Sequence, residues 1–314
     1  MPYRLDRRES LEQGVRRCAR EQLDRAIDEL TEGVHTDPVE AVHTARKALK
    51  KDRSLLRLYR GTLDPEERRR ANVLLRNAGR RLSSARDAEV MLQALDDLAE
   101  HFAGRVPERT FEAIRAHLVA ARDPARARLL ESGATAEVAD KLKATRSGTE
   151  AWRLDGGGWG AVEPGLVRAY GRGRAARKRA RREPSVENLH EWRKRTKDLW
   201  YHLRLLAPTS PGIVGGQAKE AHRLSDLLGD DHDLAVLRDR LHSNESEFAV
   251  DVEPVFDLID HRREQLQEQA MLVGERLYAE KPKAFGRRMH RYWKAWRREA
   301  KAAAAPRPTA QPIA

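Results

Sequence analysis

The sequence is poor in the residues that build disulfides and strands. One cysteine, Cys18, occurs in 314 residues, and aromatic residues make up 5% of the chain. A single thiol forms no intrachain disulfide and is too few for a zinc site, which suits a reducing compartment. Aromatic residues and isoleucine favour strands, whereas the abundant Ala, Leu, Arg and Glu favour helices. We therefore expect an all-α protein.

Long apolar runs are also missing. No stretch approaches the ~20 apolar residues that a membrane-spanning helix needs. The amino terminus, MPYRLDRRESLEQ, carries charge where a secretory signal has its apolar segment. These absences predict a soluble cytoplasmic protein without a membrane partner.

What the sequence has in excess is positive charge. Its 61 lysines and arginines outnumber 49 acidic residues, which leaves a formal net charge of +12. Such a balance indicates an anionic partner. Charged residues make up 35% and apolar residues 40% of the chain, compared with about 25% and about 45–50% in typical domains. The core must therefore be thin and built from amphipathic elements.

Helical periodicity runs from Ser10 to about Lys301 and is interrupted by Gly and Pro rather than by alternating apolar residues. Asp37-Pro38 and Asp64-Pro65 each place an N-cap acid before a proline at the first helical position. The pattern predicts eight helices, the longer of which can be broken, near residues 10–32, 38–61, 65–102, 107–130, 162–182, 185–206, 213–245 and 253–300.

A glycine-rich segment, LDGGGWG at residues 154–160, divides the chain into near-equal halves. The carboxy-terminal tail is proline-broken and typical of disorder. Together these features predict a first four-helix repeat over 8–150, a linker over 151–161, a second four-helix repeat over 162–301 and a disordered tail over 302–314.

One helical segment occurs twice, which indicates a structural unit used twice. Residues 42–51 (VHTARKALKK) match 189–198 (LHEWRKRTKD), and the matching extends onward at a constant offset of 147 residues. Further along, residues 82–91 (LSSARDAEVM) match 228–237 (LGDDHDLAVL) at an offset of 146. The order of elements is therefore repeated as well.

The repeated helix has one cationic face in each copy. At about 100° of turn per residue, basic residues fall on one side and apolar ones on the other. The cationic faces hold His43, Arg46, Lys47, Lys50 and Arg57 in the first copy, and His190, Arg193, Lys194, Lys197, Tyr201 and Arg204 in the second. Like charges four residues apart destabilise a helix by about 0.2–0.5 kcal/mol per pair. A solvated basic face is the alternative interpretation, but the same repulsion in both copies favours a bound polyanion.

Three further helices carry cations on one face. Arg76 and Arg80 align with Asp87 on the third predicted helix, and Arg174 lies on a basic face of the helix before the second motif. Arg287 and Arg291 share one face of the last predicted helix. These faces fit either anion binding or solubility alone. Because carboxylate and phosphate repel each other, Asp87 and Asp233 are expected to orient neighbouring arginines or cap helices.

The motif H-x-x-R-[KR]-x-x-K, which opens a helix twice, together with LGDDHDLAVL after the second copy, resembles the CHAD domain, the conserved histidine α-helical domain. The resemblance covers about residues 8–300. It implies two pseudo-twofold-related four-helix bundles with a basic central cavity, and binding of inorganic polyphosphate. The implied binding positions are the basic motif residues named above; we add Arg76, Arg80, Arg174 and Tyr201 as candidates.

Three features depart from the family pattern. The segment 50–53 (KKDR) stands where a denser arginine run is favoured, and Ser83 replaces the glycine found at 229, which weakens the turn expected there. CHAD domains often follow a CYTH triphosphatase domain, but the alternating ExExK strand motif does not occur here. Triphosphatase activity is therefore not expected.

Histidine suits such a site because it can donate one hydrogen bond when neutral or become cationic near an anion. We expect bound phosphate to raise the pKa of His43 and His190 above ~6.5, so that affinity rises as pH falls.

Two other functions remain open. A nucleic-acid-binding protein fits the same net charge, although no base-stacking aromatic ladder appears. A metal phosphohydrolase is suggested by residues 230–233 (DDHD), but adjacent helical residues point in different directions and the first copy lacks the histidine. We predict a binding protein that is not an enzyme, needs no cofactor or metal, and associates with polyphosphate granules in the cytoplasm.

Overall fold

The computed structural model describes residues 3–304, apart from the side chains of residues 84–88, 125–126, 129–130 and 303–304. This part of the chain is all-α and contains no strand; one isolated β-bridge pairs Leu63 with Leu154. The helices are α1 (Leu11–Asp28), α2 (Val34–Thr36), α3 (Pro38–Leu58), α4 (Pro65–Arg81), α5 (Ser84–His101), α6 (Glu108–Glu131), α7 (Ala134–Gly148), α8 (Trp159–Arg182), α9 (Val186–Leu206), α10 (Ile213–Ser243), α11 (Glu253–Leu277) and α12 (Pro282–Ala304). Short turns are the π-helical η1 (Glu29–Gly33) and the 3-10 turns η2 (Thr149–Ala151), η3 (Ala207–Thr209) and η4 (Glu245–Glu247).

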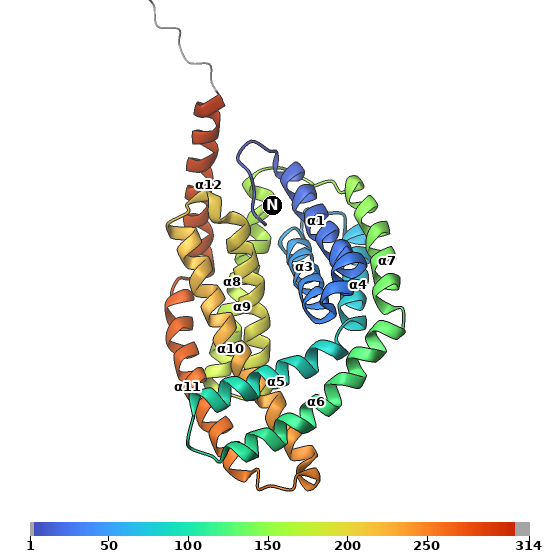
Figure 1. The fold of residues 1–314 in the computed structure, drawn as a ribbon. Helices are drawn as coiled ribbons and strands as arrows, with labels where there is room; N and C mark the ends of the chain where they lie inside the picture. The colour runs from blue at the N-terminus through green and yellow to red at the C-terminus, as the bar shows by residue number, and fades with distance from the viewer. Residues whose placement is uncertain (1–2, 305–314) are drawn as a thin grey trace, which may run out of the picture.

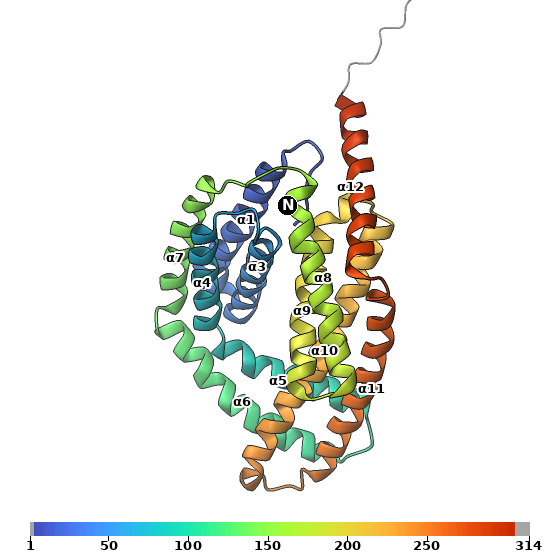
Figure 2. The ribbon, with the colours of Figure 1, turned by 180° about the vertical axis from the view of Figure 1, so that it is seen from behind.

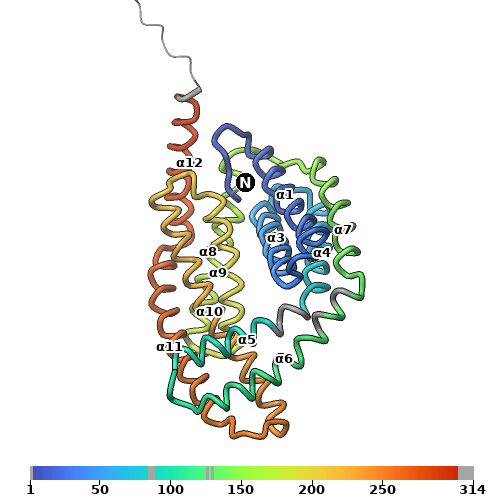
Figure 3. Tube along the Cα trace, in the orientation of Figure 1, coloured from blue at the N-terminus to red at the C-terminus, as the bar shows by residue number. Residues whose placement is uncertain are grey.

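The helices gather around two hydrophobic cores (Figures 1 and 2). The larger core joins α1, α3, α4 and α7 of the first half to α8, α9, α10 and α12 of the second. In the smaller core, Leu95 of α5 and Ile114 of α6 pack with Leu237 of α10 and Ile259 of α11. Figure 3 shows α5 and α6 leaving the first half as an arm that reaches α10 and α11. The first half therefore contributes helices to both cores.

The predicted helices are present, with differences at three places. The span predicted over 65–102 is broken between Arg81 and Ser84, and the span over 253–300 is broken between Leu277 and Pro282. Helix α7 has no counterpart among the predicted helices; it follows Gly133, whose φ of +63° lies in the left-handed region that favours glycine. The arrangement as two pseudo-symmetric bundles and the domain boundaries stay predictions. The tail predicted over 302–314 lies outside the described residues from 305 onward.

The turn expected at Gly229 is absent. Gly229 lies inside the 31-residue helix α10, whereas its counterpart region in the first copy is the break between α4 and α5. A Cβ at position 229 would lie 3.0 Å from the Arg193 guanidinium, so the glycine makes room for this side chain rather than for a turn.

Side-chain caps fix where the motif helices begin. Asp37 Oδ1 accepts hydrogen bonds from the backbone N–H groups of Val39 and Glu40 at 3.0 and 3.1 Å, and Pro38 takes the first position of α3. The Ser185 hydroxyl accepts from the Asn188 N–H at 3.3 Å at the start of α9. Because N-cap oxygens satisfy amides that lack intrahelical partners, both motif helices have a defined first turn.

A close backbone approach joins α8 to α3. A Cβ added at Gly165 would overlap the Leu58 carbonyl group, so only glycine allows α8 to lie this near the end of α3. The contact is enclosed, since Leu58 and Leu166, the residue after the glycine, are 0% exposed. The two halves of the chain are thus in direct contact.

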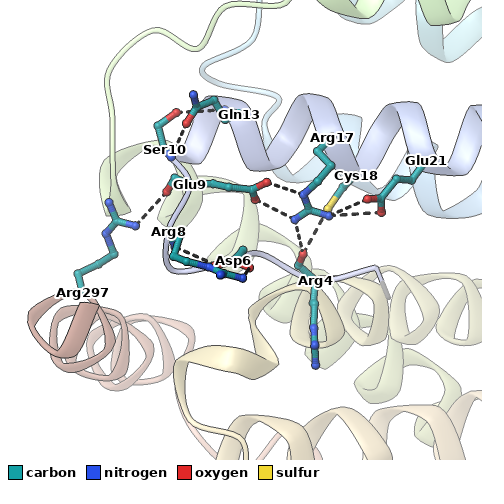
Figure 4. A network of polar contacts seen from close by, with 10 residues as sticks. All are labelled: Arg4, Asp6, Arg8, Glu9, Ser10, Gln13, Arg17, Cys18, Glu21 and Arg297. Atoms are coloured by element: carbon teal, nitrogen blue, oxygen red, sulfur yellow. Dashed lines mark hydrogen bonds and ion pairs between the residues drawn. The ribbon is translucent and has the colours of Figure 1, made fainter. Parts of the chain in front are cut away.

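The amino-terminal residues bridge the same halves. The Tyr3 hydroxyl donates to the Lys51 carbonyl oxygen at 3.1 Å, and the Leu5 N–H donates to the Leu205 carbonyl oxygen at 3.0 Å. Figure 4 shows the polar network beside this segment, in which Arg17 pairs with Glu9 and Glu21 and donates to the Arg4 carbonyl oxygen.

Cys18 also belongs to this network (Figure 4). Its thiol lies 3.5 Å from the Arg4 carbonyl oxygen and is 0% exposed, and burial raises its pKa to about 12. A buried thiol of high pKa is unreactive, so Cys18 is a structural residue.

Candidate basic interface

The two motif helices, α3 and α9, lie side by side where the halves meet (Figures 1 and 2). Arg57 Nη1 donates to Asp198 Oδ1 at 2.8 Å, and the Ser54 hydroxyl lies 3.4 Å from the Asp198 carbonyl oxygen. His202 Nε2 lies 2.9 Å from the Ser54 carbonyl oxygen, to which it donates. The two motif helices therefore contact each other through the residues that follow the H-x-x-R-[KR]-x-x-K segments.

Arginines surround Asp198 on one side of the contact between α3 and α9. Besides Arg57, Arg195 Nη1 donates to Asp198 Oδ2 at 3.1 Å. Burial lowers the pKa of Arg172, as does the positive charge of Arg195. Burial also lowers the pKa of Arg53 to about 10, with a further contribution from the neighbouring charge of Arg57. Glu191 of α9 also pairs with Arg195 at 3.0 Å and with Arg172 at 3.7 Å. Two carboxylates thus stand among four guanidinium groups, and the region keeps a positive excess.

A second group of cations lies around Lys51. This residue is 9% exposed, and its ammonium group donates to Gln22 Oε1 at 2.8 Å. Burial lowers its pKa to about 8, followed by repulsion from Arg204 of α9 and from Arg25 and Lys47. Motif cations of both copies therefore act on the same buried side chain.

A pocket between α3 and α4 collects four of the residues predicted from the sequence. Its cavity volume is about 270 Å³. Among the described residues that line it, none is acidic. The lining consists of Arg46, Lys50, Arg53, Arg76 and Arg80, with Leu49, Leu75, Gly79 and Ser83. We call this cavity the α3–α4 pocket. Arg46 is held by its bond to the Gly79 carbonyl oxygen.

In the second copy, neighbouring acids contact the motif cations. Arg193 Nη1 lies 3.6 Å from Asp233 Oδ1 of α10, as the sequence predicts for an aspartate that orients an arginine. Lys194 pairs with Glu191 at 2.8 Å, and the Lys197 ammonium lies 6.0 Å from the centre of the Trp200 ring. The sequence interpretation of a nearly acid-free face therefore does not hold in the second copy, because Glu191 of the same helix and Asp233 of α10 both contact its cations.

His190 is half-buried and lies against another histidine. Its ring centre is 4.1 Å from that of His232 on α10. Burial lowers the pKa of His190 to about 4, and the charges of His232, Lys194 and Arg193 add to the effect. Its Nδ1 is buried, and no described group hydrogen-bonds to it. His190 is neutral at physiological pH in the unliganded protein. His43 is half-buried at the matching position of α3.

Two predicted site residues lie elsewhere. Tyr201 is 2% exposed and packs between Tyr3 and Trp200, with ring centres at 6.4 and 4.6 Å, so it does not face solvent. Arg174 donates to the Tyr278 carbonyl oxygen at 3.3 Å, at the end of α11. Residues two positions apart lie on opposite sides of a helix. Arg172, two positions before Arg174, is the residue whose pKa is lowered by the charges of Arg195 and Arg57.

Sequence reasoning missed Arg53, Arg172, Arg195 and Lys51 as members of the interface. The motif comparison pairs Arg53 with Trp200 and Lys51 with Asp198, so no repeated signal marks them. The side chain of Asp87 lies outside the described residues.

The acidic run 230–233 has structural roles in α10. Asp231 is 1% exposed and accepts hydrogen bonds from Arg263 and Gln267 at 3.2 and 2.7 Å. Burial raises the pKa of Asp230 to about 6, followed by repulsion from Asp233. Within the described part of the chain, no three His, Cys, Asp or Glu side chains converge as metal ligands would. The described helices also include none that combines the length and apolar character required to span a membrane.

This architecture is similar to that of a known protein. PptA from Streptomyces chartreusis has a similar structure, with a TM-score of 0.58 and 14% sequence identity over 87% of this chain and 100% of that chain. At that identity the likeness concerns the fold. No curated protein matches the sequence. The family model of the CHAD domain matches residues 17–242, which include both motif helices. The chain therefore belongs to the CHAD domain family.

Proposed function

We propose that this protein binds inorganic polyphosphate, without catalysis, through a basic channel between its two repeats. The observation that carries the proposal is the contact between α3 and α9. There Lys47 of the first motif copy and Arg204 of the second both act on the buried Lys51, and Arg57 of the first copy pairs with Asp198 of α9. This contact gathers several positive charges along one interface. Such a line of charges fits a linear polyanion.

The residue types support the same ligand. A polyphosphate chain presents repeated charges, so it needs several separated cations rather than one deep pocket. Arginine forks can bind phosphate oxygens in pairs, and lysine supplies a mobile point charge. The binding positions proposed here are His43, Arg46, Lys47, Lys50, Arg57, Arg76, Arg80, His190, Arg193, Lys194, Lys197 and Arg204, with Arg53 and Arg172 added by the structure.

Nucleic acid is the second candidate for the same surface. All six tryptophans are buried, the most exposed being Trp200 at 9%. Proteins that bind single strands stack bases on exposed aromatic rings, so this feature favours polyphosphate. In competition, long polyphosphate is expected to displace nucleic acid at a lower concentration of charge, and the reverse order would favour the nucleic-acid function.

The direct test is calorimetric titration with polyphosphates of graded length. The variant Arg193→Glu/Lys197→Glu is expected to weaken binding by at least about tenfold, because it replaces attraction with repulsion at two positions. Arg287→Glu/Arg291→Glu is the matched control: these exposed arginines have the same spacing on α12, at the outer edge of the molecule (Figure 1). Equal losses in both variants would show that net charge alone governs binding.

Catalysis and location have separate tests. Release of phosphate during incubation with polyphosphate and a divalent ion would contradict the non-catalytic proposal. We also propose a cytoplasmic location at polyphosphate granules. A fluorescent fusion that stays diffuse in granule-containing cells would contradict it.

A further inference from the structure

The α3–α4 pocket lies beside a helix break that the second copy lacks. Helix α4 ends at Arg81 and α5 begins at Ser84, whereas the matching residues 228–230 lie within the continuous helix α10. Ser83, at the break, lines the pocket. The first copy thus has a helix N-terminus where the second copy has uninterrupted backbone.

This helix N-terminus adds to the positive charge of the pocket. The Ser83 hydroxyl donates to the Arg80 carbonyl oxygen at 2.8 Å, so it does not cap the first amides of α5. The backbone amides and the dipole of a helix N-terminus favour an anion. Ser83, the residue before α5, lines the cavity together with five basic side chains.

The matching region of the second copy is filled and carries a negative charge. Arg53 corresponds to Trp200 at the offset of 147, and Arg80 corresponds to Asp226 at the offset of 146. Trp200 is 9% exposed and contacts the His222 ring, with centres 4.0 Å apart, and His222 pairs with Asp226 at 2.6 Å. An aromatic ring and a carboxylate therefore replace two guanidinium groups.

We propose that the α3–α4 pocket is an end site, which binds the terminal phosphoryl group of a polyphosphate chain and holds short oligophosphates on its own. This inference rests on the proposed function and deepens it. A terminal phosphoryl group carries about −1.5 to −2 charges at neutral pH because its second pKa is about 6, whereas an internal phosphate carries one. A compact cluster of cations with a helix N-terminus matches the denser charge. The second copy, filled by Trp200, contacts only internal phosphates.

Gly79 allows a clean test. A Cβ at this position meets nothing within 4 Å, so Gly79→Asp and its uncharged match Gly79→Asn both fit the fold. Tripolyphosphate is titrated calorimetrically into wild-type protein and both variants. Gly79→Asp is expected to lower its affinity at least about tenfold by charge repulsion, with Gly79→Asn within about threefold of wild type. Asp226→Asn, at the position of the second copy that matches Arg80, is expected to leave the affinity within about threefold.

The outcomes separate this inference from the proposed function. Equal tripolyphosphate affinity of the Gly79→Asp and Gly79→Asn variants, or no tripolyphosphate binding by wild-type protein that binds long chains, would overturn the end site alone. Failure of wild-type protein to bind long chains would overturn the proposed function. Circular dichroism melts of all variants show whether each change leaves the helices intact.

Discussion

Burial and a neighbouring histidine determine the charge of His190. Its pKa is lowered to about 4 from 6.5, with burial as the largest cause and His232 next. The unfolded state therefore binds more protons between these values, and the unliganded protein loses stability as pH falls through this window. The negative charge of a bound phosphate raises the pKa of the imidazole. The affinity for polyphosphate is therefore expected to rise as pH falls, whereas the stability of the unliganded protein decreases.

His190→Gln is therefore expected to change two pH profiles. The fall in thermal stability between about pH 7 and about pH 5 should become shallower, although His232 and His202, whose pKa values are also lowered by burial, keep part of it. Polyphosphate affinity should lose part of its rise between about pH 8 and about pH 6, and His43 should supply the part that remains. Differential scanning calorimetry and titration measure the two effects. A wild-type affinity that is flat over this range would contradict the role of the histidine.

Asp52 is a buried carboxyl group in an apolar position. It is 1% exposed, no described group hydrogen-bonds to either oxygen, and burial raises its pKa well above the ordinary value. The second copy has Leu199 at the matching position. The folded state holds the proton to a higher pH than the unfolded state, so this residue costs more stability as pH rises.

Asp52→Leu should therefore stabilise the protein by about 1–3 kcal/mol, the cost of an unsatisfied buried polar group. The difference from wild type should widen between about pH 5 and about pH 8 as the cost of keeping the carboxyl protonated grows. Chemical denaturation at the two pH values measures it. A variant less stable than wild type at both would mean that the carboxyl makes a favourable contact.

Local signals predicted the starts of helices better than their interruptions. Asp37, Asp64 and Ser185 cap α3, α4 and α9 as their sequence pattern indicates. The break after Arg81 has no adjacent glycine or proline to mark it. Leu82 is 0% exposed in the larger core, but so is its counterpart Leu228 in the continuous helix α10, so burial of this position does not distinguish the two copies. Periodicity describes apolar faces, and these are alike in a broken and an unbroken helix.

The same limit applies to the site. The helical wheel predicted Arg46, Lys50, Arg76 and Arg80, which share one pocket because the cationic faces of α3 and α4 meet there. Tyr201 was assigned to a cationic face, but α9 is enclosed at that point by Tyr3 of a distant segment. Which neighbour covers a face depends on the packing of other elements, and the sequence of one helix does not contain it.

Gly165 lies where α8 packs against the end of α3, so a substitution there tests this contact between the two halves. Gly165→Ala places a methyl group against the Leu58 carbonyl, so α8 must shift away from α3. We expect a loss of about 1–3 kcal/mol in unfolding free energy, as in other overpacked cores. Gly160→Ala, at a helical position where a Cβ meets nothing within 4 Å, is the control. Equal stability of the two variants would contradict the close approach.

For the molecule as a whole, the distribution of charge predicts a salt dependence. Binding of a polyanion releases counterions, with a slope on the order of −0.7 per neutralised phosphate by analogy with single-stranded nucleic acid. Long polyphosphate should show a steeper slope of log affinity against log salt than tripolyphosphate, because it contacts cations of both repeats. Titrations at several salt concentrations measure the slopes. Equal slopes would mean that a long chain uses only one local site.

The arm formed by α5 and α6 affects how the polypeptide is made. Leu95 and Ile114 are buried only once Leu237 and Ile259 are in place, and these residues lie more than a hundred positions later in the chain. On the ribosome, the arm emerges well before its partners are synthesised, and exposed apolar surface of this kind attracts chaperones. The arm therefore completes its burial only after Ile259 has been translated.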